Sequence, residues 1–166
     1  MRIWQWAPLT LLLVAGCNSQ RDLPFSGDRA AAVERDVRAY AATIAHDVTQ
    51  QGPSAWRRHL ADSPAFFMAS EGRLVFPDSA TAKAAVQYLE RTIKHIELTW
   101  GNDLRVDPLT PDLAIIGSSY HEIRVDNAGH TVDESGFFTA TAENKNGRWQ
   151  LRNAHWSVIA PPPAVR

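Results

Sequence analysis

The chain has 166 residues, of which 45% are hydrophobic and 21% charged, so it can bury one core and is not disordered. Seventeen Lys and Arg against 18 Asp and Glu leave a formal net charge of −1. That balance offers no basic footprint for a phosphate backbone, and we expect no nucleic-acid partner. The sequence contains no internal repeat and no complete catalytic signature, so we expect one domain whose function must come from its site.

The N-terminus has the layout of a secretory signal. An apolar run over residues 7–16 follows one basic residue and ends at two small residues directly before Cys17, the one cysteine of the sequence. The run is shorter than the roughly 20 residues that a membrane-spanning helix needs. The segment Val14-Ala15-Gly16-Cys17 resembles the bacterial lipobox, in which the cysteine becomes the acylated first residue of the mature chain.

The lipobox resemblance implies a location as well as a modification. Residues 1–16 are then a lipoprotein signal peptide that is removed, and lipid on Cys17 anchors the protein to a membrane. Asn18 follows, not the Asp that retains such proteins in the inner membrane, so the resemblance implies the outer membrane, facing the periplasm. We expect residues 17–27 to form a flexible tether. The alternative is an ordinary secreted protein with a chance cysteine.

Three helices are predicted in the first half of the chain. Asp28 can cap a first helix that carries one apolar stripe and ends at Gly52. That stripe is Val33, Val37, Tyr40, Ile44 and Val48. Pro53 suits the first position of a short second helix that carries Trp56 and Leu60. Ser79 is expected to cap a third helix. Its apolar side is Ala84, Ala85, Tyr88, Leu89 and Ile93.

Extended segments surround and follow the third helix. A hairpin over residues 65–76 turns at Glu71-Gly72, and after residue 95 apolar residues alternate with polar ones. Further strands are expected near residues 112–125, 132–143 and 148–159, joined by turns at 126–129 and 144–147. This order predicts an α+β domain over residues 28–159, with three N-terminal helices packed on a strongly curved antiparallel sheet. Residues 160–166 are a Pro-rich tail.

The last strand carries the resemblance to a known family. Residues 147–157, GRWQLRNAHWS, resemble the closing strand of SnoaL-like, nuclear transport factor 2-like domains. The hairpin around Gly72, the helix after Ser79 and the strand that begins at residues 111–116 fit the same pattern. The resemblance implies a cystatin-like cone with a cavity between helices and sheet. That fold hosts isomerases, dehydratases, cyclases and non-catalytic association domains, so it does not decide the function.

Side-chain alternation and the resemblance together suggest which residues meet in the cavity. The expected ligand pocket consists of Tyr40, Trp56, Tyr120, Glu122, Phe138 and Trp156. The alternative for each aromatic residue is plain core packing. We place Trp149, Thr139 and His155 on the convex face, where many relatives dimerise. The apolar side of the last strand changes near Asn153, and this change predicts either a bulge there or a strand that passes from one cover to another.

The sequence offers little catalytic chemistry. His155 and Glu122 are possible catalytic residues, since either can act as a base when a substrate lies within hydrogen-bond reach. An apolar cavity would raise the pKa of the Glu122 carboxyl, but the place of Glu122 near the end of its strand favours exposure to solvent. The six histidines have no paired metal-ligand spacing, so we expect no metal, and no motif predicts a cofactor. The isomerase-type set of one Tyr and two Asp cannot be matched onto this chain.

Three functions remain open from the sequence. The leading hypothesis is a lipid-anchored, periplasm-facing domain whose cavity binds a small, mainly apolar ligand. The second is a homodimeric structural or interaction module of the cell envelope that uses the convex sheet face. The third is an enzyme of the SnoaL or isomerase type.

Overall fold

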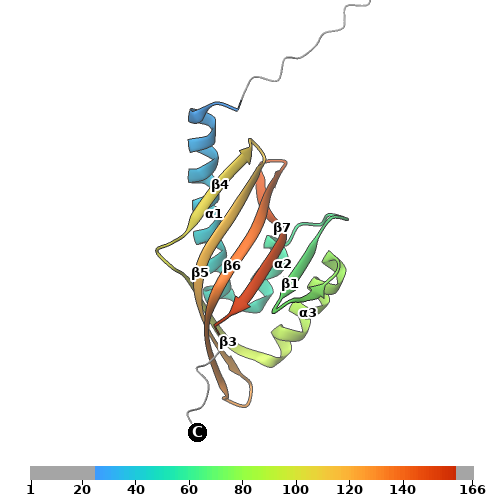
Figure 1. The fold of residues 1–166 in the computed structure, drawn as a ribbon. Helices are drawn as coiled ribbons and strands as arrows, with labels where there is room; N and C mark the ends of the chain where they lie inside the picture. The colour runs from blue at the N-terminus through green and yellow to red at the C-terminus, as the bar shows by residue number, and fades with distance from the viewer. Residues whose placement is uncertain (1–24, 160–166) are drawn as a thin grey trace, which may run out of the picture.

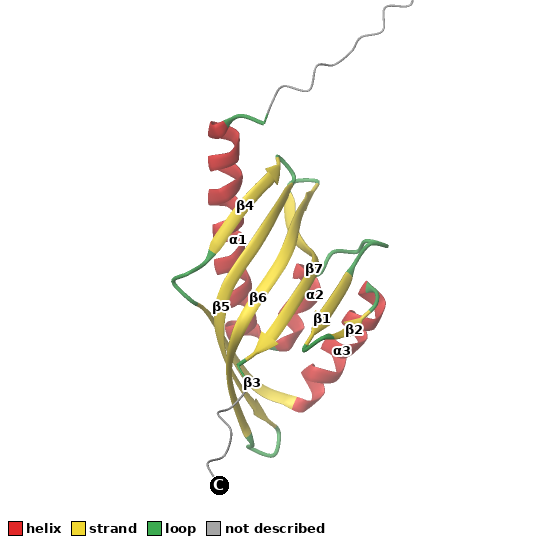
Figure 2. Cartoon of the chain, in the orientation of Figure 1, coloured by secondary structure: helices red, strands yellow, loops and turns green. Residues whose placement is uncertain are grey.

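The computed structural model describes residues 25–159, which form three helices and a seven-stranded sheet (Figures 1 and 2). The helices are α1 (Gly27–Gln51), α2 (Trp56–His59) and α3 (Ser79–Thr92), with a 3-10 turn at Pro53–Ala55 before α2. The strands are β1 (Phe67–Ser70), β2 (Arg73–Phe76), β3 (Ile93–Trp100), β4 (Arg105–Thr110), β5 (Leu113–Asp126), β6 (Thr131–Lys145) and β7 (Arg148–Val158). The predicted signal peptide, the lipidation site and the Pro-rich tail lie outside the described residues.

The two longer helices begin at side-chain caps and end at clear stops. Ser26, not Asp28, caps α1, and Gly52 ends the helix with a positive φ of 75°. The predicted apolar stripe of α1 is buried throughout. Asp78, not Ser79, caps α3, because its carboxylate accepts a hydrogen bond from the Thr81 N–H at 2.7 Å. Both caps therefore precede the predicted residue by one or two positions.

The sheet has the strand order β2-β1-β7-β6-β5-β3, and β4 pairs with the first half of β5. All pairs are antiparallel except β1 with β7, so the sheet is mixed and not wholly antiparallel as predicted. Strand β4 was not predicted, because Pro108 breaks the pattern and fits only an edge strand. Ile93 begins β3 and does not lie on the third helix.

The helices lie on one face of the curved sheet (Figure 2). Helix α1 packs across β3 and β4, and side chains tie it to β3. The Trp100 indole N–H donates to the Ala41 carbonyl at 2.7 Å, and the Thr49 hydroxyl accepts from the Leu98 N–H at 3.0 Å. These bonds satisfy polar groups beneath the helix and set its position on the sheet.

Strand β7 contains the predicted bulge. Asn153 pairs with Thr141 and Leu151 pairs with Ala142, so Arg152 is the extra residue. The extra residue shifts the alternation by one, and Leu151 therefore faces the helices together with Phe138 on β6. Trp149 has the same orientation and packs against the core. Its predicted place on the convex face is wrong because the bulge restores the inward parity.

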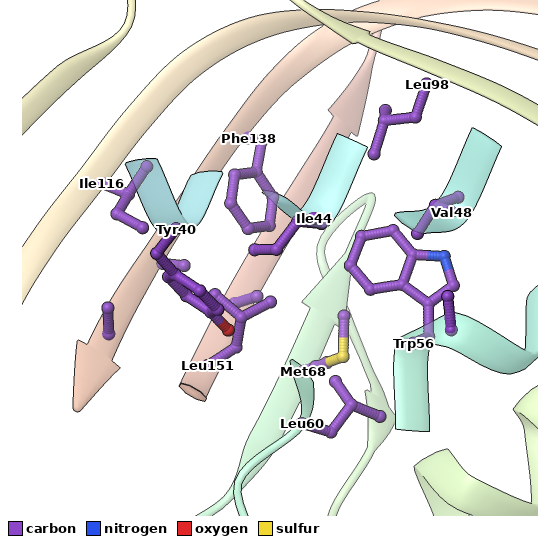
Figure 3. Close-up of a cluster of buried hydrophobic side chains, with 14 of the residues drawn as sticks. Tyr40, Ile44, Val48, Trp56, Leu60, Met68, Leu98, Ile116, Phe138 and Leu151 are labelled. Atoms are coloured by element: carbon purple, nitrogen blue, oxygen red, sulfur yellow. The ribbon is translucent and has the colours of Figure 1, made fainter. Parts of the chain in front are cut away.

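The hydrophobic core fills the space between α1 and the middle of the sheet (Figure 3). Ile44 and Val48 of α1 and Ile116 and Phe138 of the sheet are at most 1% exposed. Burial of each such side chain contributes roughly 1.5–3 kcal/mol. The inward side chains of the sheet that lie beyond this core face α3.

Candidate functional site

A cavity of about 310 Å³ lies where the sheet, α2, α3 and the β1–β2 hairpin meet. The sheet contributes Ile96, Tyr120, Glu122, Arg124, Glu134, Trp156 and Val158. Helices α2 and α3 contribute Trp56, Ala82, Ala85, Val86 and Leu89, the residue directly after α2 contributes Leu60, and the hairpin contributes Met68, Ser70, Val75 and Phe76. Val75 and Val158 are exposed, so the cavity reaches the surface beside them. Most of these side chains are apolar, and the space suits an apolar molecule.

An aromatic wall separates the cavity from the core. Trp156 is its centre, with ring centroids 4.8 Å from Tyr120, 5.8 Å from Trp56 and 4.4 Å from Phe138. The planes of Tyr120 and Trp56 are nearly perpendicular to that of Trp156, the edge-to-face arrangement that aromatic rings favour. Trp100, which does not line the cavity, stacks on Trp156 with ring centroids 6.0 Å apart. This contact helps to hold Trp156 in place.

The polar groups of the cavity gather on β5 and β6. Glu122 and Glu134 are directly opposite each other in the antiparallel register, and Arg124 contacts both. The Arg124 Nε lies 3.2 Å from Oε1 of Glu122, and its Nη2 lies 2.8 Å from Oε2 of Glu134. Two carboxylates facing each other would repel, so the guanidinium between them stabilises the pair.

Burial controls the protonation of this group. Glu122 is 7% exposed, so the exposure expected from its place near the strand end is wrong, because β5 continues to Asp126. Loss of hydration raises the pKa of its carboxyl to about 7, with Arg124 opposing the rise and Glu134 adding to it. Burial, followed by the charges of Glu134 and Glu122, raises the pKa of the Tyr120 phenol to about 12. Glu122 therefore exchanges its proton near neutral pH, whereas Tyr120 keeps its proton.

Four of the six predicted pocket residues line the cavity, namely Trp56, Tyr120, Glu122 and Trp156. The other two, Tyr40 and Phe138, do not. The Tyr40 hydroxyl donates to the His59 carbonyl at 3.1 Å in a buried site, and Phe138 is wholly buried behind the aromatic wall. Both side chains point into the space between the helices and the sheet as predicted, but they are packed in the core and do not reach the cavity.

The structure separates His155 from the cavity. It is exposed, pairs across the sheet with Thr139 of β6, and lies between the inward residues Ala154 and Trp156 on β7. Because neighbouring strand residues point to opposite faces, its imidazole lies on the outer face, as expected for the convex side. His155 therefore does not contact the cavity, and the structure does not support the possible catalytic role that we assigned to it.

Sequence reasoning missed the lining that α3 and the hairpin provide, together with Arg124 and Glu134. The residues of α3 and the hairpin come together only through packing, so no local pattern reports them. Glu134 was within reach of prediction, because counting outward from the 126–129 turn places it opposite Glu122.

A second buried polar cluster lies away from the cavity, between α1 and α2. Nε2 of His59 lies 3.0 Å from Oδ2 of Asp47, and both side chains are almost fully buried. Burial lowers the pKa of His59 although the Asp47 carboxylate opposes that effect. Gln150 donates to the Leu60 carbonyl beside this pair at 3.3 Å. The cluster joins α2 to α1 and β7, a structural role.

Two further properties bear on the site. Among residues 25–159, no three His, Cys, Asp or Glu side chains come close enough together to hold a metal ion. No helix in the same range combines the length and the apolar character needed to cross a membrane.

Comparisons with known proteins show likeness in structure alone. No protein-family model and no curated protein matches the chain. A nuclear transport factor 2-like superfamily protein from Salmonella enterica has a TM-score of 0.67 and 12% identity, over 81% of this chain and 96% of that one. A candidate scytalone dehydratase from Novosphingobium aromaticivorans has a TM-score of 0.63 and 11% identity, over 80% and 88%. A candidate calcium/calmodulin dependent protein kinase II association domain from Xanthomonas campestris has a TM-score of 0.61 and 20% identity, over 79% and 89%.

Proposed function

We propose that this chain, which has the nuclear transport factor 2-like fold, binds a small, mainly apolar molecule in the cavity between its sheet and α3. The observation that carries the proposal is the lining of this cavity. The aromatic wall and apolar side chains of α3 surround one polar cluster, which consists of Glu122, Arg124 and Glu134 on β5 and β6. The cavity volume of about 310 Å³ is at the lower end of the range for small-molecule sites. If these residues were packed together as an ordinary core, no space of that size would remain between them.

Indole fluorescence provides the test, because Trp56 and Trp156 lie in the wall. Titration with a panel of small aromatic and alicyclic compounds should give saturable changes. Ala85→Phe places a ring in the cavity from α3 and should abolish them, whereas Ala84→Phe, at an exposed position on the same helix, should not. Equal binding by both variants and the parent would refute the site.

The location of the protein is a second part of the proposal. We propose that lipid on Cys17 anchors it to the outer membrane, facing the periplasm, on the strength of the lipobox resemblance. Figure 1 supports a suitable orientation, because α1 begins at the end of the molecule remote from α3. A tether attached at that end leaves the cavity mouth free to exchange its ligand.

A homodimer is a further function that one observation favours. Phe67, Ile115 and Phe137 are 45%, 42% and 42% exposed, and the strand register sets them on the outer face of the sheet. Apolar side chains gathered on one sheet face favour contact with a second copy of that face. Sedimentation of the parent and of Phe137→Glu tests this, and a monomeric parent contradicts it.

An isomerase-type reaction is a third candidate function, favoured by the protonation of Glu122. A carboxyl group with a pKa of about 7 in an apolar cavity suits the transfer of a proton from carbon. Exchange of ligand hydrogen for deuterium in heavy water tests this. Exchange should occur with the parent protein and cease in Glu122→Gln, and an inert parent contradicts it.

A further inference from the structure

We propose that the ligand carries a protonated amine, which lies against Glu122 while its apolar body packs on Trp156 and Trp56. This inference rests on the proposed function, since it names the class of ligand that the cavity takes. It depends on the charge balance of the lining, on the aromatic rings beside the acidic group and on the way Arg124 is held.

The lining carries an excess of negative charge when its carboxyl groups are ionised. Glu122 and Glu134 contribute two negative charges and Arg124 one positive charge. Within residues 25–159, every other side chain that lines the cavity, from α2, α3, the hairpin, β3 and β7, is uncharged. One negative charge is therefore unmatched at the edge of an apolar space, where it is costly until a cation joins it.

The arrangement of Arg124 disfavours an anionic ligand. Its guanidinium already contacts a carboxylate on each side, at 3.2 Å and 2.8 Å. An anion approaching it would also meet Glu122 and Glu134. A carboxylate offers about four acceptor positions in all, and the contact with Arg124 involves Oε1 of Glu122, so the group can accept from an ammonium as well.

Aromatic rings next to the acidic group add a second attraction for a cation. Tyr120 precedes Glu122 by two residues on β5, so the two side chains project to the same side of the sheet. The Tyr120 ring is packed against Trp156 at 4.8 Å. The faces of such rings attract a cation, most strongly where water is excluded. A neutral alcohol of the same shape would gain neither this attraction nor the ion pair.

Amine binding should be linked to the protonation of Glu122. The groups that face it are Arg124 and Tyr120 of β5 and Glu134 of β6, with the charge of Glu71 acting on Tyr120. Since Glu122 exchanges its proton near pH 7, it is largely protonated at pH 5.5 and ionised at pH 8. An alkylamine stays charged over this range, so its affinity should rise with pH as Glu122 loses its proton.

The experiment compares three probes of one shape, naphthylmethylamine, naphthylmethanol and naphthoate, by isothermal titration calorimetry. We expect the amine to bind at least about tenfold more tightly than the other two at pH 8, and at least about tenfold more tightly at pH 8 than at pH 5.5. Repeating the amine titration near pH 6.5 in buffers of different ionisation enthalpy should reveal proton release. Affinity of the alcohol should not change with pH.

Two variants assign the effect to the acidic group. Glu122→Gln should weaken the amine about tenfold and leave the alcohol within about twofold, and the half-buried Glu134→Gln should act in the same direction if Glu122→Gln fails to fold. Glu97→Gln, exposed on β3, is the matched control. Tight binding of the alcohol or naphthoate with no preference for the amine overturns this inference and leaves the proposed function standing. Failure of all three probes overturns this inference, and it overturns the proposed function as well when the fluorescence panel also gives no response.

Discussion

The rings of Trp156 and Phe138 meet at a centroid distance of 4.4 Å with their planes 48° apart, yet they belong to different regions of the molecule. Phe138 has no exposed surface and is packed in the core, whereas Trp156 is half-buried and lines the cavity. The contact between them is the boundary between the close-packed core and the part of the domain that contains the cavity.

Truncation on the two sides of this boundary should have different effects. Phe138→Ala should cost about 3–5 kcal/mol in free energy of unfolding, because it leaves a void in a close-packed core. Trp156→Ala should cost less, since one side of its ring already borders open space, but it should weaken ligand binding. Urea unfolding beside fluorescence titration measures both. Equal destabilisation by the two variants, with binding intact in Trp156→Ala, would contradict this division.

Gly136 on β6 should tolerate no side chain. A Cβ at this position would collide with the Ser157 carbonyl oxygen of β7 and lie 2.8 Å from Cε1 of Tyr120. Gly136→Ala should therefore destabilise the protein by about 1–3 kcal/mol and disturb the aromatic wall. Gly117→Ala is the control, because its Cβ would meet the Phe137 ring at an ordinary 3.6 Å. Thermal unfolding compares them, and similar midpoints would count against the packing described.

The protonation of Glu122 should make stability depend on pH. Its pKa is about 7 in the folded state against 4.5 as the ordinary value, so the folded protein binds the proton more tightly. Free energy of unfolding should therefore fall by roughly 3 kcal/mol between pH 4.5 and 7 and then level off. In Glu122→Gln this fall should disappear. The difference between parent and variant cancels the opposite contribution of His59, and a difference that does not vary with pH contradicts the assignment.

Local patterns were enough to predict the main elements and the inward orientation of the long strands. Helical spacing located α1, the turns at 126–129 and 144–147 set the register of β5 to β7, and the parity change near Asn153 correctly indicated a bulge. The parallel pairing of β1 with β7 was not predictable in this way, because it joins segments distant in the chain. Strand β4 was not predicted because it contains Pro108, and proline argues against a strand unless that strand lies at a sheet edge, as β4 does.

The sequence was enough to predict which way the site residues point, but not which of them are packed in the core and which line the cavity. Alternation along β5 and β6 correctly placed Tyr120, Glu122 and Phe138 on the inner face, but it cannot tell which of them α1 covers. Helix α1 covers Phe138, whereas α3 stands away from Tyr120 and Glu122 and leaves the cavity. The position of α3 depends on its packing against the hairpin and α2, and no periodicity encodes that.

Anchoring can be tested independently of the cavity. Cys17→Ser should release the protein from membranes into the soluble fraction while its thermal unfolding stays unchanged, since Cys17 precedes the folded domain. Intact mass analysis of the parent should find a chain that starts at Cys17 and carries acyl mass. A parent chain that starts elsewhere, or one without added mass, would contradict the lipid anchor.

Native mass spectrometry of the protein, purified from its own cells without denaturant, detects whatever the cavity holds and so shows directly whether it binds a ligand. We predict an added mass of a small organic molecule on the parent protein, retained in Ala84→Phe and absent from Ala85→Phe, in which the new ring occupies the space beside Trp156. The same added mass in Ala85→Phe, or none on the parent together with no response in the fluorescence titrations, would contradict a ligand-binding cavity.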